Sequence, residues 1–134
     1  MFEERPEVQD RLATEIVAWL TTVSPDGQPQ SSPVWFLARV DTIVVYSLDR
    51  TPRTRNIRAN RKVSLNLNSS RSGGQLVIIE GEAEIVPDGA PADGDVDYVA
   101  KYEAELTELG MTPRSFARDY PVLIHVRPTR LRAS

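Results

Sequence analysis

Cysteine is absent from this sequence of 134 residues, and histidine occurs only once, at His125. The lack of cysteine excludes disulfides, thiolate metal sites and cysteine nucleophiles. A single histidine excludes most zinc sites and any chemistry that needs a pair of histidines. The sequence therefore predicts no metal site.

Long hydrophobic runs are also missing. No stretch approaches the roughly 20 apolar residues of a membrane span, and the charged segment 1–10 has no apolar run of signal-peptide length. We therefore expect a cytoplasmic protein that does not enter a membrane. Hydrophobic residues make up 40% of the chain and charged residues 26%, which is typical of a soluble globular protein. The length suits one domain, residues 1–134, with one hydrophobic core.

Positive charge is distributed unevenly along the chain. The formal net charge of −3 argues against a general nucleic-acid binder, so we expect no nucleic-acid partner. Six of the 16 basic residues nevertheless lie between positions 50 and 62, which we call the basic segment: Arg50, Arg53, Arg55, Arg58, Arg61 and Lys62. This clustering is the first indication of function.

Six segments have the β-branched, aromatic or alternating residues that are typical of strands: 16–24, 28–38, 42–48, 63–68, 75–86 and 121–131. Turn signals such as Ser24-Pro25-Asp26-Gly27 join them as hairpins rather than βαβ units. This predicts a mainly β fold, a six-stranded antiparallel β-barrel with peripheral helices. Pro29 and Pro33 each remove a backbone donor from the second segment, which predicts an edge, a bulge or an opening there.

Four segments carry helical spacing or capping signals: 7–15, 51–60, 96–109 and 113–119. The second of them begins at Thr51-Pro52, where an N-cap residue is followed by proline at the first helical position. The fourth begins in the same way, at Thr112-Pro113. These helices are expected at the periphery of the barrel.

The helix predicted at 51–60 has an unusual charge pattern. Its first turn carries Arg53 and Arg55, although the partial positive charge of a helix start normally disfavours cations, and an anionic ligand would relieve this. Arg55, Arg58 and Lys62 follow at spacings of three and four residues, which places them on one face. The pattern favours a phosphate with a further anionic tail. The alternative is a solvated arginine-rich helix that pairs with acids such as Asp49.

A second constellation lies on the second predicted strand, where small residues and a proline precede a bulky apolar run: Ser31, Ser32, Pro33, Val34, Trp35 and Phe36. Small side chains let a flat ring approach the backbone, whose free polar groups can bind the ring's edge. The alternative is plain core packing, and we expect at least two of Val34, Trp35 and Phe36 to be core or interface. Tyr46 and Ser47 end the next strand, and their hydroxyls are placed to lie beside the same ligand.

Taken in order, these motifs resemble the pyridoxamine-phosphate-oxidase-like split-barrel superfamily. The matching residues are Thr22, Pro25-Asp26-Gly27, Pro29, 32–36, Val45-Tyr46-Ser47, Arg55-Asn56-Ile57, Asn60, Val63-Ser64-Leu65 and Gly81. Within the superfamily, the sequence is most similar to the small actinobacterial deazaflavin-dependent reductases that use coenzyme F-420. The resemblance covers residues 8–86 and returns at 126–132.

The resemblance implies a six-stranded antiparallel split β-barrel that forms a homodimer, with an isoalloxazine-type ring in a cleft at the dimer interface. The ring would be contacted by the strand that carries Ser31, Ser32, Pro33, Val34 and Trp35. The phosphate would be bound by Tyr46, Ser47, Arg53, Thr54, Arg55 and Arg58. Gln75 matches a position that often lies near the ring of the neighbouring subunit.

Two positions depart from the pattern of the relatives. Many of them have lysine where this chain has Arg53. Arginine keeps the charge but donates from a planar, forked guanidinium instead of from a compact ammonium group. The final segment, 130–134, lacks the aromatic residue that relatives often carry there.

No acid, base or nucleophile stands out. We interpret Glu80, Glu82 and Glu84 as the outer face of a strand, and His125 as a packed or rim residue. The resemblance implies a coenzyme F-420-dependent oxidoreductase that transfers a hydride to an unsaturated or quinone-like small molecule. The alternatives are an FMN-binding oxidase or reductase of the same fold, and a non-catalytic cofactor-binding or haem-linked protein. The substrate wall is expected from residues 95–120 and from the second subunit.

Overall fold

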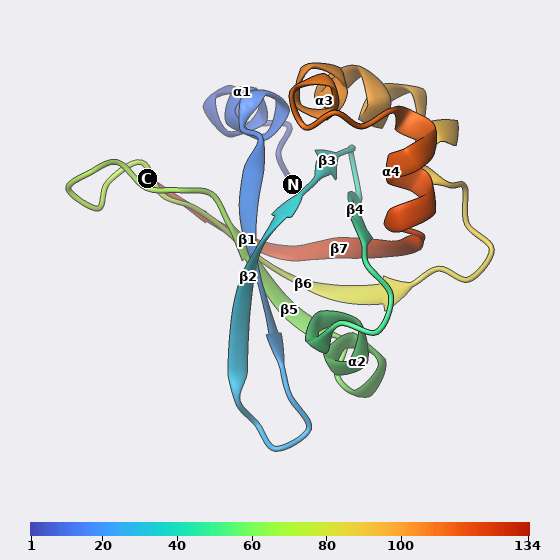
Figure 1. Ribbon diagram of the computed structural model, residues 1–134. Coiled ribbons are helices and arrows are strands. Elements are labelled where there is room, and N and C mark those ends of the chain that lie inside the picture. The colour runs from blue at the N-terminus through green and yellow to red at the C-terminus, as the bar shows by residue number, and fades with distance from the viewer.

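The computed structural model describes all residues from 1 to 134, and its main feature is one curled antiparallel sheet (Figure 1). The strand order is β2-β1-β5-β6-β7-β4-β3. β2 and β3 lie at opposite ends of this order but are consecutive in the chain, so the chain brings the two sheet edges together and the sheet forms a split barrel. The strands are β1 (Val17–Val23), β2 (Pro29–Trp35), β3 (Leu37–Ala38), β4 (Ile43–Ser47), β5 (Lys62–Asn66), β6 (Val77–Ile85) and β7 (Val122–Ala133).

Helices surround the sheet, as predicted. In Figure 1, α1 and α3 lie at the top, α4 lies beside the start of β7, and α2 lies at the bottom. No helix is both long and apolar enough to cross a membrane. The helices are α1 (Pro6–Thr14), α2 (Pro52–Ala59), the short 3-10 helix η1 (Ala92–Gly94), α3 (Val96–Glu108) and α4 (Pro113–Asp119).

The predicted strand 28–38 is two strands, so the sheet has seven strands rather than six. It is interrupted at Phe36, whose backbone N–H donates to the hydroxyl of Tyr102 instead of to a neighbouring strand. The predicted edge at Pro29 and Pro33 is confirmed, because β2 pairs only with β1. β6 begins at Val77, two residues later than predicted, because Gln75 adopts a left-handed backbone conformation with φ 54°.

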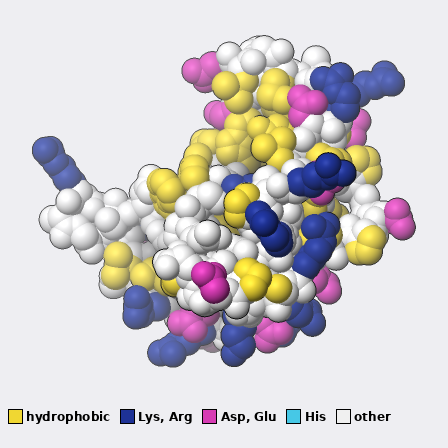
Figure 2. Space-filling view, turned by 60° about the horizontal axis from the view of Figure 1, so that its bottom comes forward, with side chains coloured by type: hydrophobic (Ala, Val, Ile, Leu, Met, Phe, Trp, Pro, Cys, Tyr) yellow, Lys and Arg dark blue, Asp and Glu magenta, His cyan; other side chains and the backbone are white.

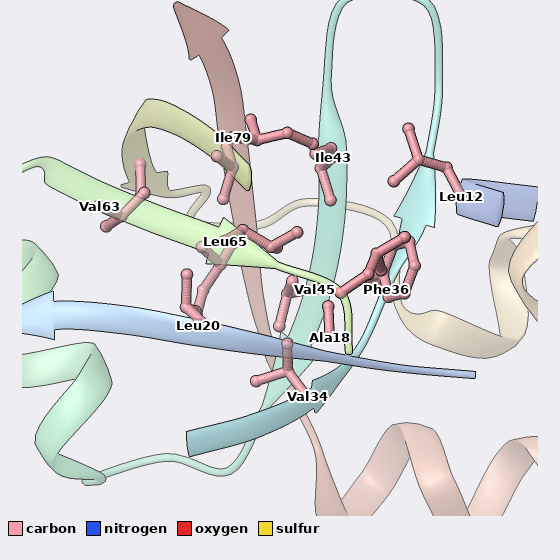
Figure 3. Packing of buried hydrophobic residues seen from close by; sticks show 14 of the residues in the cluster. Leu12, Ala18, Leu20, Val34, Phe36, Ile43, Val45, Val63, Leu65 and Ile79 are labelled. Atoms are coloured by element: carbon pink, nitrogen blue, oxygen red, sulfur yellow. The ribbon is translucent and has the colours of Figure 1, made fainter. Parts of the chain in front are cut away.

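The barrel interior is filled mainly by aliphatic side chains that come from strands all around the barrel (Figure 3). Leu20, Val45, Leu65 and Ile79 are almost completely buried there. Full burial of such a side chain contributes about 1.5–3 kcal/mol, so this cluster is the main source of stability. At least two of Val34, Trp35 and Phe36 were expected in the core or at an interface, and Val34 and Phe36 both belong to the core.

A second cluster lies outside the barrel, where α3 and α4 pack on β4 and β7. Half of its eight buried residues are aromatic, namely Tyr46, Tyr98, Tyr102 and Phe116, and the half-buried Trp35 and Tyr120 pack against the cluster. Because this cluster joins the helices to the sheet, it determines where α3 and α4 lie relative to β2.

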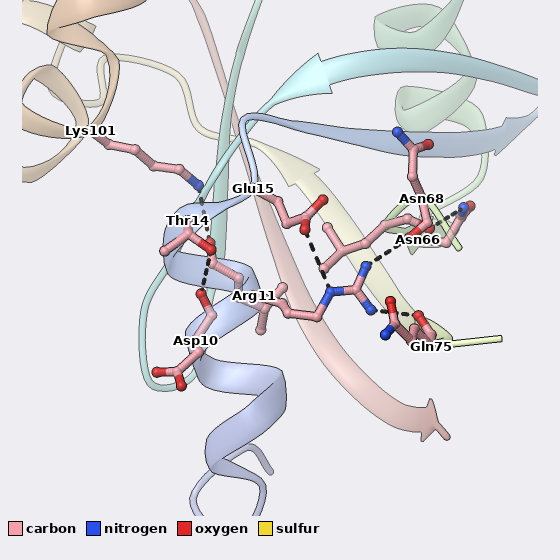
Figure 4. A network of polar contacts seen from close by, with 10 residues as sticks. Asp10, Arg11, Thr14, Glu15, Asn66, Asn68, Gln75 and Lys101 are labelled. Atoms are coloured by element: carbon pink, nitrogen blue, oxygen red, sulfur yellow. Dashed lines mark hydrogen bonds and ion pairs between the residues drawn. The ribbon is translucent and has the colours of Figure 1, made fainter. Parts of the chain in front are cut away.

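A polar network ties α1 to the loop between β5 and β6 (Figure 4). The Arg11 guanidinium donates to the carbonyl oxygen of Asn68 at 2.7 Å and to that of Gln75, and it lies 3.5 Å from a carboxylate oxygen of Glu15. Arg11 therefore holds both ends of this loop against the N-terminal helix.

Candidate functional site

Arg53 lies in the first turn of α2 and connects two strands of the barrel. Its Nη2 donates to the Ser32 hydroxyl on β2 at 2.8 Å, and its Nη1 donates to the Ser47 hydroxyl on β4 at 3.0 Å. The guanidinium is about half buried, and this burial lowers its pKa, although an arginine remains charged at any physiological pH. A desolvated cation without a carboxylate partner is an attractive position for an anion.

A polar cavity of about 300 Å³ lies beside this arginine, at the start of α2. The helix start is shaped by Thr51, whose side chain accepts from the backbone N–H of Thr54 as the predicted N-cap. The first N–H groups of a helix have no partner within the helix and favour anions. Because Pro52 has no N–H and that of Thr54 is bonded to Thr51, the backbone N–H of Arg53 is the one left for an anion here. The lining residues include no acidic side chain: Thr22, Gln30, Ser31, Ser32, Thr51, Pro52 and Arg53.

An apolar cavity of about 400 Å³ lies on the other side of Arg53, which is its only charged lining residue. Flat side chains form one wall. Trp35 stacks on Phe116 with ring centroids 5.4 Å apart, and Phe116 stacks on Tyr120 at 4.5 Å. The lining residues come from β1, β2, β4 and the residue after it, α2, and the α3–α4 region: Val17, Pro33, Val34, Trp35, Tyr46, Leu48, Arg53, Leu109, Met111, Phe116 and Tyr120.

The rest of the basic segment is exposed and mostly unpaired. Of its six basic residues, only Arg61 lies within 4 Å of an acidic side chain, at 3.7 Å from Glu84. The Asp49 carboxylate accepts from the backbone N–H of Arg50 instead of pairing with an arginine side chain. Figure 2 shows Lys and Arg side chains gathered where α2 comes forward, next to a hollowed strip of hydrophobic side chains. The helix is therefore not neutralised by neighbouring acids.

Most of the predicted site residues meet at Arg53. Ser31, Ser32 and Arg53 line the polar cavity, whereas Pro33, Val34, Trp35 and Tyr46 line the apolar one with Arg53. Ser47 is fully buried, and its hydroxyl accepts from Arg53. Arg55 and Arg58 lie on the exposed side of α2.

Three predicted site residues have other contacts. Thr54 is 0% exposed, and its hydroxyl donates to the carbonyl oxygen of Thr51. The Tyr46 hydroxyl donates to the carbonyl oxygen of Ala90, so only its ring faces the apolar cavity. Gln75 is exposed in the β5–β6 loop and lines neither cavity.

Four cavity residues that come from α4 and the segments next to it were not predicted individually. Leu109, Met111, Phe116 and Tyr120 line the apolar cavity together. Phe116 and Tyr120 are four residues apart, so their spacing at the predicted helix 113–119 was the available signal for one shared face. The expectation that residues 95–120 form part of a pocket wall agrees with this geometry.

The side chains interpreted as non-catalytic lie away from Arg53. Glu80 and Glu84 are exposed on the outer face of β6, and Glu82 lies 3.5 Å from Arg127. His125 is half buried and lines a separate groove with Asp95 and Asp97. Neither cavity beside Arg53 contains a histidine.

Comparison with known families agrees with this architecture. The profile described as pyridoxamine 5'-phosphate oxidase matches residues 5–134. The chain belongs to the pyridoxamine 5'-phosphate oxidase family. The resemblance read from the sequence motifs and the split-barrel fold are thereby confirmed. No curated protein matches the sequence.

Several solved structures of this family's fold are similar over nearly the whole chain. An F-420 reductase is 26% identical with a TM-score of 0.67, and the match covers 92% of this chain and 94% of that one. A FAD-binding protein from Mesorhizobium loti is 18% identical with a TM-score of 0.68, over 95% and 91% of the two chains. The heme storage protein HutZ from Vibrio cholerae is 16% identical with a TM-score of 0.70, over 96% and 93%.

Proposed function

We propose that this protein is a coenzyme F-420-dependent oxidoreductase that reduces an unsaturated or quinone-like small molecule. The observation that carries the proposal is the position of Arg53, which lines both the polar and the apolar cavity. A flavin-type cofactor has a phosphate at one end and a flat ring at the other, and the two cavities match these two parts. The 26% identical F-420 reductase supports the choice of cofactor.

The residues present fit such a group. The start of α2, the Ser32 hydroxyl and the Arg53 fork are the donors that a phosphate requires. The apolar cavity with its aromatic wall suits a flat ring and a hydrophobic substrate next to it. Arg55 and Arg58 have no acidic partner and extend the positive charge along α2, which suits an anionic tail beyond the first phosphate.

The protein's part in the reaction is to bind, to orient and to exclude water. When bound, a deazaflavin supplies the hydride chemistry, so the chain needs no nucleophile of its own. Trp35 and Phe116 would hold flat reactants parallel to one another, and Leu109 and Met111 would add apolar surface around them. Fixing two reactants in one orientation is itself a large contribution to rate.

We also propose that the protein forms a homodimer through the outer face of β1, β2 and β5. The residues on this face are uncharged and paired in register: Trp19 with Pro33 and Asn66, and Thr21 with Ser31 and Ser64. Trp19 is 38% exposed on this face, and a partner subunit packed there would cover its ring. The mass measured by light scattering should be that of a dimer, and Trp19→Glu should give the mass of a monomer.

The deciding experiment is a titration with coenzyme F-420 and with FMN, followed by fluorescence. Arg55→Ala and Arg58→Ala should each weaken F-420 binding, and Arg71→Ala, which removes an exposed arginine from the β5–β6 loop, should not. F-420 binding should also fall more steeply with added salt than FMN binding, because its tail carries more charge.

The same titration, followed by an assay of quinone and enone reduction, separates the alternatives. Tighter binding of FMN, with no effect of Arg55→Ala or Arg58→Ala, would favour an FMN-dependent oxidase or reductase. Binding without reduction of any quinone or enone would favour a cofactor-binding protein without catalytic activity. Binding of neither cofactor would reject the proposal.

A further inference from the structure

The interruption between β2 and β3 is filled by one side chain from α3. The Tyr102 hydroxyl accepts from the backbone N–H of Phe36 at 2.7 Å. The same oxygen lies 2.9 Å from the carbonyl oxygen of Phe36 and 2.8 Å from that of Ile16, to which it donates. Buried backbone groups need partners, and here the Tyr102 hydroxyl bonds the backbone groups that a neighbouring strand would otherwise bond.

A second α3 side chain supports this arrangement. The Lys101 ammonium donates to the carbonyl oxygen of Phe36 at 2.8 Å and to that of Leu12 at 3.1 Å, and it lies 3.7 Å from the centre of the Phe36 ring. The backbone of Phe36 is therefore held by α3 at both its donor and its acceptor.

The ring of Tyr102 also fixes the neighbouring residue. It stacks on Trp35 with ring centroids 4.5 Å apart and planes 4° apart. Trp35 lines the apolar cavity, whereas Tyr102 does not. Tyr102 thus fixes the backbone of Phe36, the residue after Trp35, and it also fixes the plane of the Trp35 ring. Tyr102 itself does not face the cavity.

Tyr98, one turn earlier on α3, provides a natural contrast. It is 1% exposed, similar to Tyr102, and packs against Tyr46, Phe116 and Tyr102 itself. Its hydroxyl has no hydrogen-bond partner, and its ring does not stack on Trp35. Loss of the Tyr98 hydroxyl should therefore leave the cavity wall unchanged.

We propose that Tyr102 is a positioning residue, which sets the plane of Trp35 and through it the fit of a flat ligand in the apolar cavity. The part of this inference that concerns the ligand rests on the function proposed above. The part that concerns Trp35 does not, because it can be measured in the protein alone.

The test compares Tyr102→Phe with Tyr98→Phe in a Trp19→Phe background, where Trp35 is the only tryptophan. Acrylamide quenching of Trp35 should rise about twofold in Tyr102→Phe, because the unanchored backbone gives the ring more freedom, and should stay at the parent value in Tyr98→Phe. The Kd for coenzyme F-420 should rise about tenfold in Tyr102→Phe and less than twofold in Tyr98→Phe. Far-UV circular dichroism confirms that each variant is folded.

Unchanged Trp35 quenching in a folded Tyr102→Phe variant would overturn the proposal, as would equal changes in the two tyrosine variants. If Tyr102→Phe does not fold, Lys101→Met replaces it: this variant must also raise Trp35 quenching, since it removes a donor to Phe36, and an unchanged value again overturns the proposal. If the parent protein binds neither F-420 nor FMN, the proposed function fails, and the quenching comparison still decides the role of Tyr102.

Discussion

The guanidinium of Arg53 donates a hydrogen bond to the buried hydroxyl of Ser47, 3.0 Å away. Its other terminal nitrogen donates to Ser32, so one side chain from α2 bridges β2 and β4. The same group lies between a polar and an apolar cavity. Arg53 therefore acts both as part of the fold and as the junction of the candidate site.

Replacing Arg53 by lysine should separate these two roles. Lysine keeps the positive charge but presents a single ammonium instead of a fork, so it cannot reproduce the two directed bonds to Ser32 and Ser47. We expect F-420 affinity to fall about tenfold while the protein remains folded, as measured by fluorescence titration and by thermal unfolding. Arg71→Lys is the matched control, and an unchanged affinity in Arg53→Lys would contradict the assignment.

The two N-cap threonines offer a second test, because each caps a helix but the two helices lie at different places in the fold. Thr51 caps α2 beside the polar cavity, and Thr112 caps α4, where it forms a capping box with Ser115. Thr51→Ala and Thr112→Ala should each destabilise the protein by about 1 kcal/mol in urea unfolding. Only Thr51→Ala should also weaken binding of the cofactor phosphate. Equal effects of the two variants on binding would show that the start of α2 has no special role.

The sequence was most informative where local residues determine local structure. Thr51-Pro52 and Thr112-Pro113 predicted two helix starts correctly, because capping depends on residues within one turn. The break at Phe36 could not be predicted, because the hydroxyl that causes it belongs to Tyr102, 66 positions away in the sequence.

The candidate site was predictable to a similar degree. The basic segment and the strand 31–36 were recognised from their composition, and the structure brings them together at Arg53. The contribution of Met111 and Phe116 depends on how α4 packs against the sheet, which no local pattern specifies. The directions of the Tyr46 and Thr54 hydroxyls likewise depend on neighbouring backbone carbonyls rather than on residue type.

Asn56 connects α2 to the sheet and predicts an effect on stability. Its side-chain amide donates to the Thr22 hydroxyl at 2.9 Å and to the Gln30 amide oxygen at 2.8 Å. Asn56→Ala would leave the buried Thr22 hydroxyl without this partner, so we expect a loss of about 1–3 kcal/mol in the free energy of unfolding. Arg55→Ala, at the exposed neighbouring position, should change it by less than about 0.5 kcal/mol. A loss of less than about 0.5 kcal/mol in Asn56→Ala would show that water replaces the lost amide as the partner of the Thr22 hydroxyl.

Lys101 predicts how stability depends on pH. Burial lowers the pKa of Lys101 to about 8, partly offset by the nearby Glu15 carboxylate, whereas in the unfolded chain its pKa is about 10.4. Between these two values the unfolded chain binds more protons than the folded one, so the free energy of unfolding rises with pH. The penalty for burying the ammonium is thus present in full below pH 8 and is relieved as the pH increases towards the unfolded pKa.

The comparison that isolates this effect is between the parent protein and Lys101→Met, which has no titratable group at this position. In urea unfolding between pH 7.5 and about 9.5, the parent protein should gain stability relative to Lys101→Met. Taking differences removes the contribution of Tyr98 and Tyr102, whose pKa values burial raises and which oppose the trend at higher pH. A pH-independent difference between the parent and Lys101→Met would mean that Lys101 keeps its ordinary pKa, with its ammonium hydrated rather than held at Phe36.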